Sequence, residues 1–459
     1  MSMLLYVLSI VQFMIHIIVL FYENKQRSLS IFLWITLFIM YSIPDIYYTF
    51  FIEHNLYAES TYIEANVYVI LFCMIYMVTR IIINRSKKSI FLDLITLSKQ
   101  LRYKFINDKK MRYFFYISLI FIVLFNTLKI YFIISQGYVS NMNWGIARSL
   151  LENATGYWQI GDRLYIAIQN YAMIFILLTL LLKKYLITFI VLLSTLFIFA
   201  TSFNRAAMLP MICVFIVLFY YTGNKMYDWK KIFYGMIVTI IGIFIIYQLR
   251  VMRHIGSIAD IYAYFLNPNV SIFSRTLQYI FTGDGELTLS KAYYFFISQN
   301  NEFKHFGRFY TYIRLILLPI PMELSMGLKP QDFAIDMYSA WYGVLDNTTG
   351  TMHPTLYGDC YANAGFLFPL LAVFWSIFVT KIDKFLIKKG YFFKITLLVL
   401  ISSMYILIAR GAIYNACFNA FYGIVSSYVI FSFITRLANC VVSLTRFPKH
   451  NNLDLKNNE

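Results

Sequence analysis

The chain has 459 residues, of which 60% are hydrophobic, 19% aromatic and only 13% charged. Soluble domains average about 45–50% apolar and about 25% charged residues, so this composition excludes a water-soluble globular protein and indicates one embedded in a bilayer. The formal net charge of +17 would suit a nucleic-acid-binding protein, but the distribution of the basic residues described below favours another interpretation.

Eleven runs are apolar and long enough to cross a membrane, which takes about 20 largely apolar residues. The first run lacks a basic leader and a small-residue cleavage site, so we expect it to be a retained helix and not a signal peptide. The predicted fold is therefore all-α and polytopic, with about 11 transmembrane helices. In chain order the runs are about 3–22, 30–52, 63–83, 113–134, 164–182, 185–202, 206–222, 232–249, 361–380, 392–409 and 412–434.

Lysine and arginine collect on one side of these spans. Residues 84–112 carry nine basic and two acidic side chains, and such a segment is typical of a cytoplasmic loop. If this loop is cytoplasmic, the connections between successive spans alternate between the cytoplasm and the outer side. The cytoplasmic connections then have a net charge of +18 and the outer ones a net charge of −2. The basicity thus predicts a topology, with the amino terminus outside and the carboxyl terminus inside, and not a nucleic-acid partner.

This topology divides the chain into four parts. We expect a membrane domain of eight spans, a large periplasmic loop, a second membrane domain of three spans and a disordered cytoplasmic tail. Apolar stretches within the loop, such as 312–321, are too short to span and are expected to be interfacial or re-entrant. The four parts are 1–249, 250–359, 360–435 and 436–459.

Several sequence motifs are absent. The chain has no GxxxxGK[ST] loop, no GxGxxG and no HExxH, and its five cysteines lack metal-ligand spacing. These absences argue against a nucleotide, a metal or another cofactor. We therefore expect a substrate that arrives already activated, carried on a lipid.

Arginines on the expected outer face oppose the usual charge bias. Arg205 in SFNRAAM and Arg410 in ARGA each lie in a tight hairpin between two spans. Guanidinium offers paired donors that match phosphate oxygens, whereas the alternative is a snorkelling helix end. The further arginines expected to join them at a pyrophosphate are Arg250, Arg253, Arg275 and Arg314.

The stretch GTMHPTLYGDCYANAG leads directly into a span. His353 precedes a proline, which disfavours a helix at that point, and Asp359 lies near the start of the next helix. Both are candidate general bases; the alternatives are a hydrogen-bonded structural histidine and a helix cap. Tyr338, Trp341 and Tyr342 are candidates for stacking on sugar rings, and packing in the core is an equal alternative.

The chain resembles Wzy-type O-antigen polymerases. The resemblance lies in the many spans, the basic inner loops, the one long outer loop, the SFNRAAM hairpin and the HPTLYGDCYANAG segment. The resemblance implies an enzyme of the bacterial inner membrane whose active site faces the periplasm. Such an enzyme joins oligosaccharide repeat units carried on polyprenyl pyrophosphate, which is the leaving group. The resemblance also implies that the arginines bind pyrophosphate and that His353 is the base, with Asp359 as its substitute or orienting group.

The partners implied are the lipid-linked oligosaccharide, membrane lipid and a polysaccharide chain-length regulator. An O-antigen ligase has a comparable arginine-plus-histidine arrangement and stays open as an alternative. A flippase for the same lipid-linked unit is a second alternative, against which the long outer loop and the scarcity of charges within the spans argue. A membrane acyltransferase is a third, for which His16 in the first span is the only indication.

Overall fold

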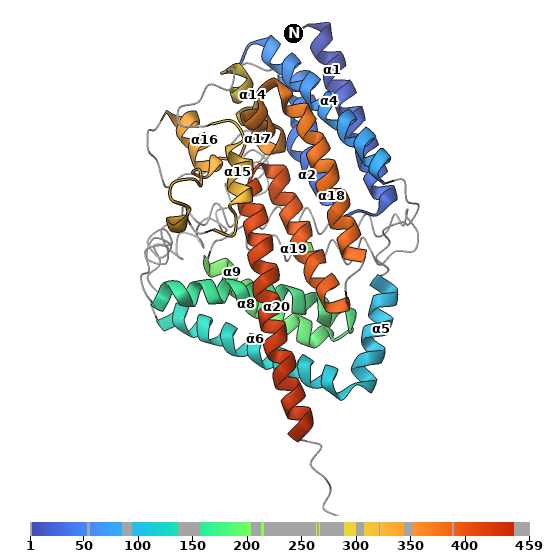
Figure 1. Ribbon diagram of the computed structural model, residues 1–459, viewed down its shortest axis with the longest axis vertical. Coiled ribbons are helices and arrows are strands. Elements are labelled where there is room, and N and C mark those ends of the chain that lie inside the picture. The colour runs from blue at the N-terminus through green and yellow to red at the C-terminus, as the bar shows by residue number, and fades with distance from the viewer. Residues whose placement is uncertain are drawn as a thin grey trace, which may run out of the picture. The chain divides into compact units, whose positions relative to one another are not determined.

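In the computed structural model, every regular element of the described residues is a helix. Seven helical segments are long and apolar enough to cross a membrane, which gives the chain the character of a multi-pass membrane protein (Figure 1). They are Met3–Gln26, Ile31–Phe51, Glu59–Ile83, Lys109–Tyr131, Thr355–Leu386, Phe392–Arg410 and Ile413–Leu444. The structure describes residues 2–52, 56–84, 94–135, 157–202, 213, 214, 263, 266, 289–299, 307–320, 322–343, 352–387 and 390–444.

Each of these seven segments overlaps one span expected from the sequence. The spans expected at 164–182 and 185–202 coincide with shorter apolar helices, Ile166–Leu181 and Tyr185–Leu196. Those expected at 206–222 and 232–249 lie outside the described residues, except for 213 and 214. The helical fold class is confirmed, and the count of eleven stays a prediction.

The described helices belong to two compact units. The first unit ends at Tyr422, within α20, and the second takes the remainder of that helix from Gly423. The first unit contains α1 (Met3–Gln26), α2 (Ile31–Leu37), α3 (Ile43–Tyr47), α4 (Glu59–Ile83), α14 (Ser290–Ser298), α15 (Tyr310–Ile316), α16 (Phe333–Tyr342), α17 (Thr355–Ala364), α18 (Leu371–Ile387), α19 (Tyr391–Arg410) and the start of α20 (Ile413–Leu444). The second contains α5 (Leu94–Asn107), α6 (Lys109–Ser135), α8 (Tyr157–Leu181) and α9 (Tyr185–Ser202).

The second unit is held together by apolar packing with a few buried polar contacts. The Phe114 ring of α6 lies 5.0 Å from that of Phe431 in α20, and the hydroxyls of Ser118 and Tyr171 lie 2.8 Å apart between α6 and α8. Isolated hydrogen bonds of this kind are common between membrane helices. None of the candidate site residues that the structure describes belongs to this unit.

In the first unit, the second span widens around a proline. Short π-helical turns at Phe38–Ser42 and Tyr48–Ile52 flank α3, which contains Pro44. Proline cannot donate the helical hydrogen bond and its ring crowds the preceding turn, and π-helical turns accommodate such an irregularity. The buried Asp45 side chain follows directly.

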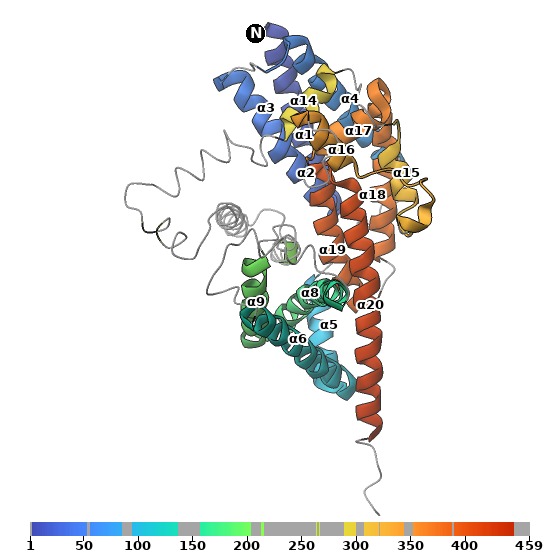
Figure 2. The same cartoon turned by 90° about the vertical axis from the view of Figure 1, so that its left-hand side faces the viewer.

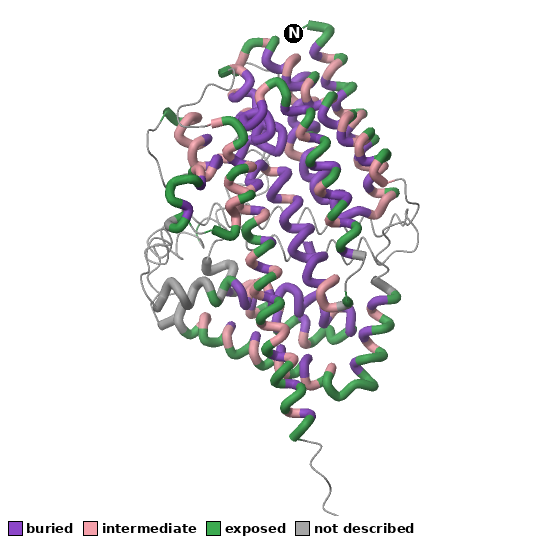
Figure 3. Tube along the Cα trace, viewed as in Figure 1, coloured by how far each residue is buried: buried purple, intermediate pink, exposed green. Residues whose placement is uncertain are grey.

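α17 forms the centre of the first unit. All ten of its residues are buried, and Figure 3 shows it as a continuous buried stretch. A Cβ added at Gly358 would lie 3.3 Å from the backbone of Tyr293 in α14, so the small residue lets these two helices approach closely. Both views show α14, α16 and α17 near the ends at which α1 and α4 begin (Figures 1 and 2).

Candidate functional site

The loop that contains His353 packs against the hairpin that contains Arg410. α19 ends at Arg410, and Gly411 follows with φ +94°. A Cβ at Gly411 would lie only 2.7 Å from the carbonyl oxygen of Thr355. Only glycine suits both the left-handed backbone and this approach, so two segments singled out separately in the sequence meet here.

His353 is enclosed by the first unit. Its side chain is buried, and the backbone N–H of the preceding Met352 donates to the carbonyl oxygen of Ala334 in α16, at 2.9 Å. Burial and the nearby positive charge of Arg410 hold the pKa of His353 well below its usual value of 6.5. The imidazole is therefore neutral at pH 7 and able to accept a proton.

The Nδ1 atom of His353 has no hydrogen-bond partner among the described residues. Two positions further on, Thr355 has φ +67°, a left-handed conformation that is an outlier for a β-branched residue. Its buried Oγ1 also lacks a described partner. Strained backbone and unpaired polar atoms concentrate at functional sites, which makes this loop the strongest candidate in the described residues.

The hydrogen-bond partners described for Asp359 do not include His353. It is buried on α17, where its carboxylate accepts hydrogen bonds from Thr311 Oγ1 at 3.2 Å and from Asn363 Nδ2 at 3.0 Å. Asn363 Oδ1 in turn accepts from the backbone N–H of Thr311, at 3.0 Å. These bonds fasten the start of α15 to α17, and none of the described hydrogen bonds joins Asp359 to His353.

Two cations lie over one aromatic ring at the start of α20. The Arg314 guanidinium is 4.1 Å and the Lys329 ammonium 5.1 Å from the centre of the Tyr414 ring, a cation–π arrangement. The nearby Asn415 donates to the carboxylate of Asp332 at 2.9 Å. Because Asp332 caps α16, this bond ties α16 to the same hairpin as Arg410.

The three candidate stacking residues lie on α16. Trp341 is half-buried, with its ring 5.2 Å from that of Phe295 in α14, so it packs within the unit. The Tyr338 and Tyr342 rings are 4.5 Å apart, and Tyr342 is exposed. The remaining predicted pyrophosphate ligands lie outside the described residues: Arg205, Arg250, Arg253 and Arg275.

Sequence reasoning missed a polar seam between α1 and α4. Ser2, the residue before α1, and three residues of α1 at successive intervals of seven each contact a residue 57 positions later, so the two helices run in parallel. The pairs are Ser2 with Glu59, Ser9 with Asn66, His16 with Cys73 and Glu23 with Arg80. The sequence does carry a signal for this seam, because polar residues recur at every seventh position of both apolar spans. Seven residues is the period at which packed parallel helices meet.

The middle of the seam is hydrogen-bonded to neighbouring helices. Asp45 accepts from Ser9 Oγ at 2.6 Å and from the Tyr294 hydroxyl of α14 at 2.9 Å. His16 Nε2 lies 2.5 Å from the Tyr357 hydroxyl of α17, and its Nδ1 lies 2.8 Å from Gln12 Nε2. These bonds give His16 a place in the packing of the helices.

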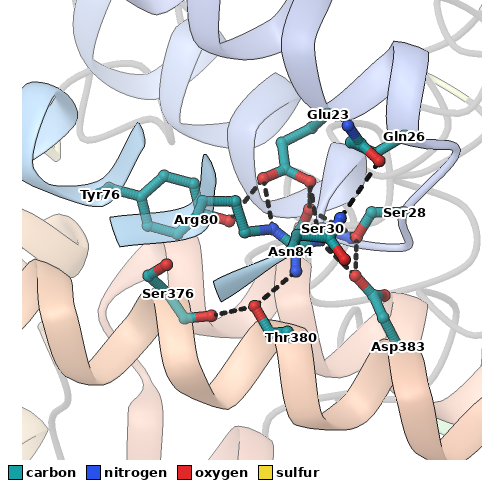
Figure 4. A network of polar contacts seen from close by, with 10 residues as sticks. All are labelled: Glu23, Gln26, Ser28, Ser30, Tyr76, Arg80, Asn84, Ser376, Thr380 and Asp383. Atoms are coloured by element: carbon teal, nitrogen blue, oxygen red, sulfur yellow. Dashed lines mark hydrogen bonds and ion pairs between the residues drawn. The ribbon is translucent and has the colours of Figure 1, made fainter. Parts of the chain in front are cut away.

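At the far end of the seam, one arginine joins two carboxylates (Figure 4). Arg80 donates to both oxygens of Glu23, at 3.0 and 3.1 Å, and to Asp383 Oδ2. The three side chains are fully buried, so the cluster has a formal net charge of −1 inside the protein. Hydroxyls donate further bonds to the same three oxygens: Tyr76 and Ser30 donate to Glu23, and Ser28 donates to Asp383 Oδ2. The fourth oxygen, Asp383 Oδ1, is buried without a hydrogen-bond partner among the described residues.

No family model matches the sequence, and no curated protein or solved structure shows significant similarity to it. The argument for a function therefore rests on the chemistry of the described residues. Two features stand out: the neutral histidine beside a guanidinium at the α19–α20 hairpin, and the ionisable seam within the spans.

Proposed function

We propose that the protein is a membrane glycosyltransferase that polymerises oligosaccharide repeat units carried on polyprenyl pyrophosphate. The observation that supports this proposal best is the contact between Gly411 and the backbone of Thr355. It brings a neutral base and a guanidinium to one place, and glycosyl transfer from a pyrophosphate needs both.

In this proposal, His353 Nδ1 accepts the proton of the acceptor hydroxyl as its oxygen attacks the anomeric carbon of the donor. The bond between that carbon and the pyrophosphate oxygen breaks, and its electron pair leaves with the pyrophosphate. Arg410 stabilises the negative charge of the leaving group, with Arg314 and the arginines at 205, 250, 253 and 275 as further candidates. No nucleotide is needed, because the lipid-linked sugar is already activated.

The finer assignments belong to the same proposal. The enzyme is of the Wzy type, it lies in the bacterial inner membrane and its active site faces the periplasm. Tyr338, Trp341 and Tyr342 contact the glycan, and a chain-length regulator is a candidate partner. Asp359 remains a candidate base in the event that substrate binding releases its bonds to Thr311 and Asn363.

A second candidate is a transporter for the same lipid-linked unit, and the buried seam favours it. Ionisable residues within spans mark transport pathways in many membrane proteins, and His16, Asp45 and the Arg80 cluster are all fully buried. In the sequence analysis, the scarcity of charges within the spans argued against a transporter. The two candidates differ in what accumulates when the protein is lost.

The test is the ladder of surface glycan from a strain that lacks the protein. A lipid core with a single repeat unit indicates a lost polymerase. A bare core with polymer on the lipid carrier indicates a ligase, and a bare core with single units trapped on the inner face indicates a transporter. An unchanged ladder contradicts all three.

Complementation then tests the site. We expect His353→Gln and Arg410→Lys to leave single repeat units, because the first removes the base and the second removes the paired donors of guanidinium. Arg436→Lys changes an exposed arginine of α20 and should restore the full ladder. A full ladder from Arg410→Lys would contradict bidentate binding of phosphate.

A further inference from the structure

Residues 322–328 form a compact turn that presents apolar side chains outward. The exposed fractions are 49% for Met322, 70% for Leu324, 92% for Met326 and 72% for Leu328. A single exposed apolar residue is ordinary, but four within seven residues make a patch of the kind that marks an interaction surface. The sequence predicts an interfacial or re-entrant segment just before this turn, at 312–321.

The patch continues onto α15, where Ile316 is 78% exposed. Neither element is long enough to cross a bilayer: α15 has seven residues, and the turn contains only the 3-10 helix Glu323–Ser325. On helices long enough to cross a membrane, apolar side chains with this exposure are expected to face lipid. Here the same exposure occurs outside any span.

The turn is closed at its base and bonded within itself. Lys329 Nζ donates to the carbonyl oxygen of Ile320 at 2.7 Å, which joins the two ends. Within the turn, the backbone N–H of Ser325 donates to the Met322 carbonyl and that of Leu328 to the Ser325 carbonyl. Internal backbone bonds lower the cost of leaving water, because an unpaired backbone group in hydrocarbon costs several kcal/mol.

The base of the turn lies where a span begins. Lys329 and Arg314 both lie over the ring of Tyr414, and Tyr414 is the second residue of the span Ile413–Leu444. Tyrosine and basic side chains are the groups that favour the boundary between hydrocarbon and headgroups. Lys329 is itself buried and Arg314 half-buried, so these two cations tie the base of the turn to the first turn of the span through the Tyr414 ring.

The geometry points to a turn, residues 322–328, that inserts its apolar side chains into the bilayer leaflet at which α20 begins. Tyr414 lies at the boundary of the hydrocarbon, and the apolar side chains of the turn contact hydrocarbon. The occupant of this surface is bilayer lipid. The inference concerns how the protein contacts the membrane, and it holds whichever reaction the protein performs.

The test measures what surrounds position 326 in the full-length protein, reconstituted into phospholipid nanodiscs. The two less buried cysteines, Cys417 and Cys440, are changed to serine, and an NBD fluorophore is attached to a cysteine introduced by Met326→Cys. A doxyl-labelled phospholipid quenches the probe from the hydrocarbon, and iodide quenches it from water. Phe421→Cys provides the lipid standard and Lys110→Cys the water standard, since both positions are exposed.

We expect lipid quenching at position 326 to lie within about twofold of the Phe421 standard, and iodide quenching to be several-fold below the Lys110 standard. Adding Leu324→Lys and Leu328→Lys should raise iodide quenching several-fold by expelling the turn. Iodide quenching equal to the Lys110 standard would overturn the inference in favour of water. Protection from both quenchers would overturn it in favour of a protein cover.

Discussion

At the scale of single residues, Gly411 determines whether the two halves of the candidate site meet. A side chain there would collide with the Thr355 carbonyl, and a left-handed backbone costs other residues about 1–2 kcal/mol. We expect Gly411→Ala to lower the melting temperature in detergent and to abolish polymerisation. Gly390→Ala is the matched control, since Gly390 caps the other end of α19 with open space around it; equal effects of the two changes would contradict the prediction.

The acid side of the activity profile tests His353. Its pKa is lowered by burial and by Arg410, so the neutral, active form persists well below pH 6.5. For the proposed transferase activity of the reconstituted protein, we therefore expect kcat/KM to fall only below that pH. Arg410→Gln removes the positive charge that lowers the pKa of His353. On lowering the pH, the residual activity of this variant should therefore begin to fall at a higher pH than that of the unchanged protein.

The same lowered pKa affects stability with a definite sign. The unfolded chain binds a proton at this histidine more readily than the folded protein, so folding weakens as the pH falls below about 6.5. His353→Gln should remove this part of the pH dependence. If the stability of His353→Gln fell with pH as steeply as that of the unchanged protein, other groups would be the cause of the pH dependence.

The sequence singled out His353 and Arg410 as candidates, but it did not indicate their surroundings. Their residue types and the proline and glycine beside them were visible locally. The bonds of Asp359 to Thr311 and Asn363 were not, because the partners lie on another element and polar side chains of this kind have no sequence period. Asp359 was accordingly predicted to act with His353, whereas its described bonds fasten α15.

At the scale of elements, seven of the eleven expected apolar runs coincide with helices long and apolar enough to cross a membrane, and the seam between α1 and α4 was overlooked. Each of its polar residues is isolated within a hydrophobic stretch and was interpreted singly. His16 was considered only as an indication of an acyltransferase, and Arg80 was interpreted as a side chain that snorkels near the inner end of its span. Comparing the two spans for a shared period of seven would have aligned them.

The Arg80 cluster allows a comparison of charge states. With one cation and two carboxylates its net charge is −1; Arg80→Met makes it −2, and Asp383→Asn makes it zero. Removal of one partner from a buried pair costs about 3–5 kcal/mol. We expect Arg80→Met to be much the more destabilising of the two in thermal unfolding.

The exposed Lys384 lies next to Asp383 on α18, and Lys384→Met serves as the control with no expected effect. If Asp383→Asn proved as damaging as Arg80→Met, the net charge would not be the deciding quantity. The specific bonds of Asp383 to Arg80 and Ser28 would then be responsible.

At the scale of the whole molecule, charge distribution makes the strongest remaining prediction. With +18 on one side and −2 on the other, the carboxyl terminus should lie in the cytoplasm and the amino terminus outside. A fluorescent protein fused after Glu459 should fluoresce, and an epitope before Met1 should be reached by antibody in spheroplasts. An inaccessible amino-terminal epitope beside a fluorescent carboxyl terminus would contradict an odd number of spans.

The Arg80 cluster also sets an order of assembly during synthesis. Glu23 and Arg80 are 57 residues apart, but Asp383 follows Arg80 by 303. At about 5–20 residues per second, the ribosome needs roughly 15–60 s to make that stretch. Glu23 of α1 and Arg80 of α4 can form their ion pair early. α18, which carries Asp383, then docks onto two helices that have already entered the bilayer. The closure of this end therefore has to wait for the 303 residues that separate Asp383 from Arg80.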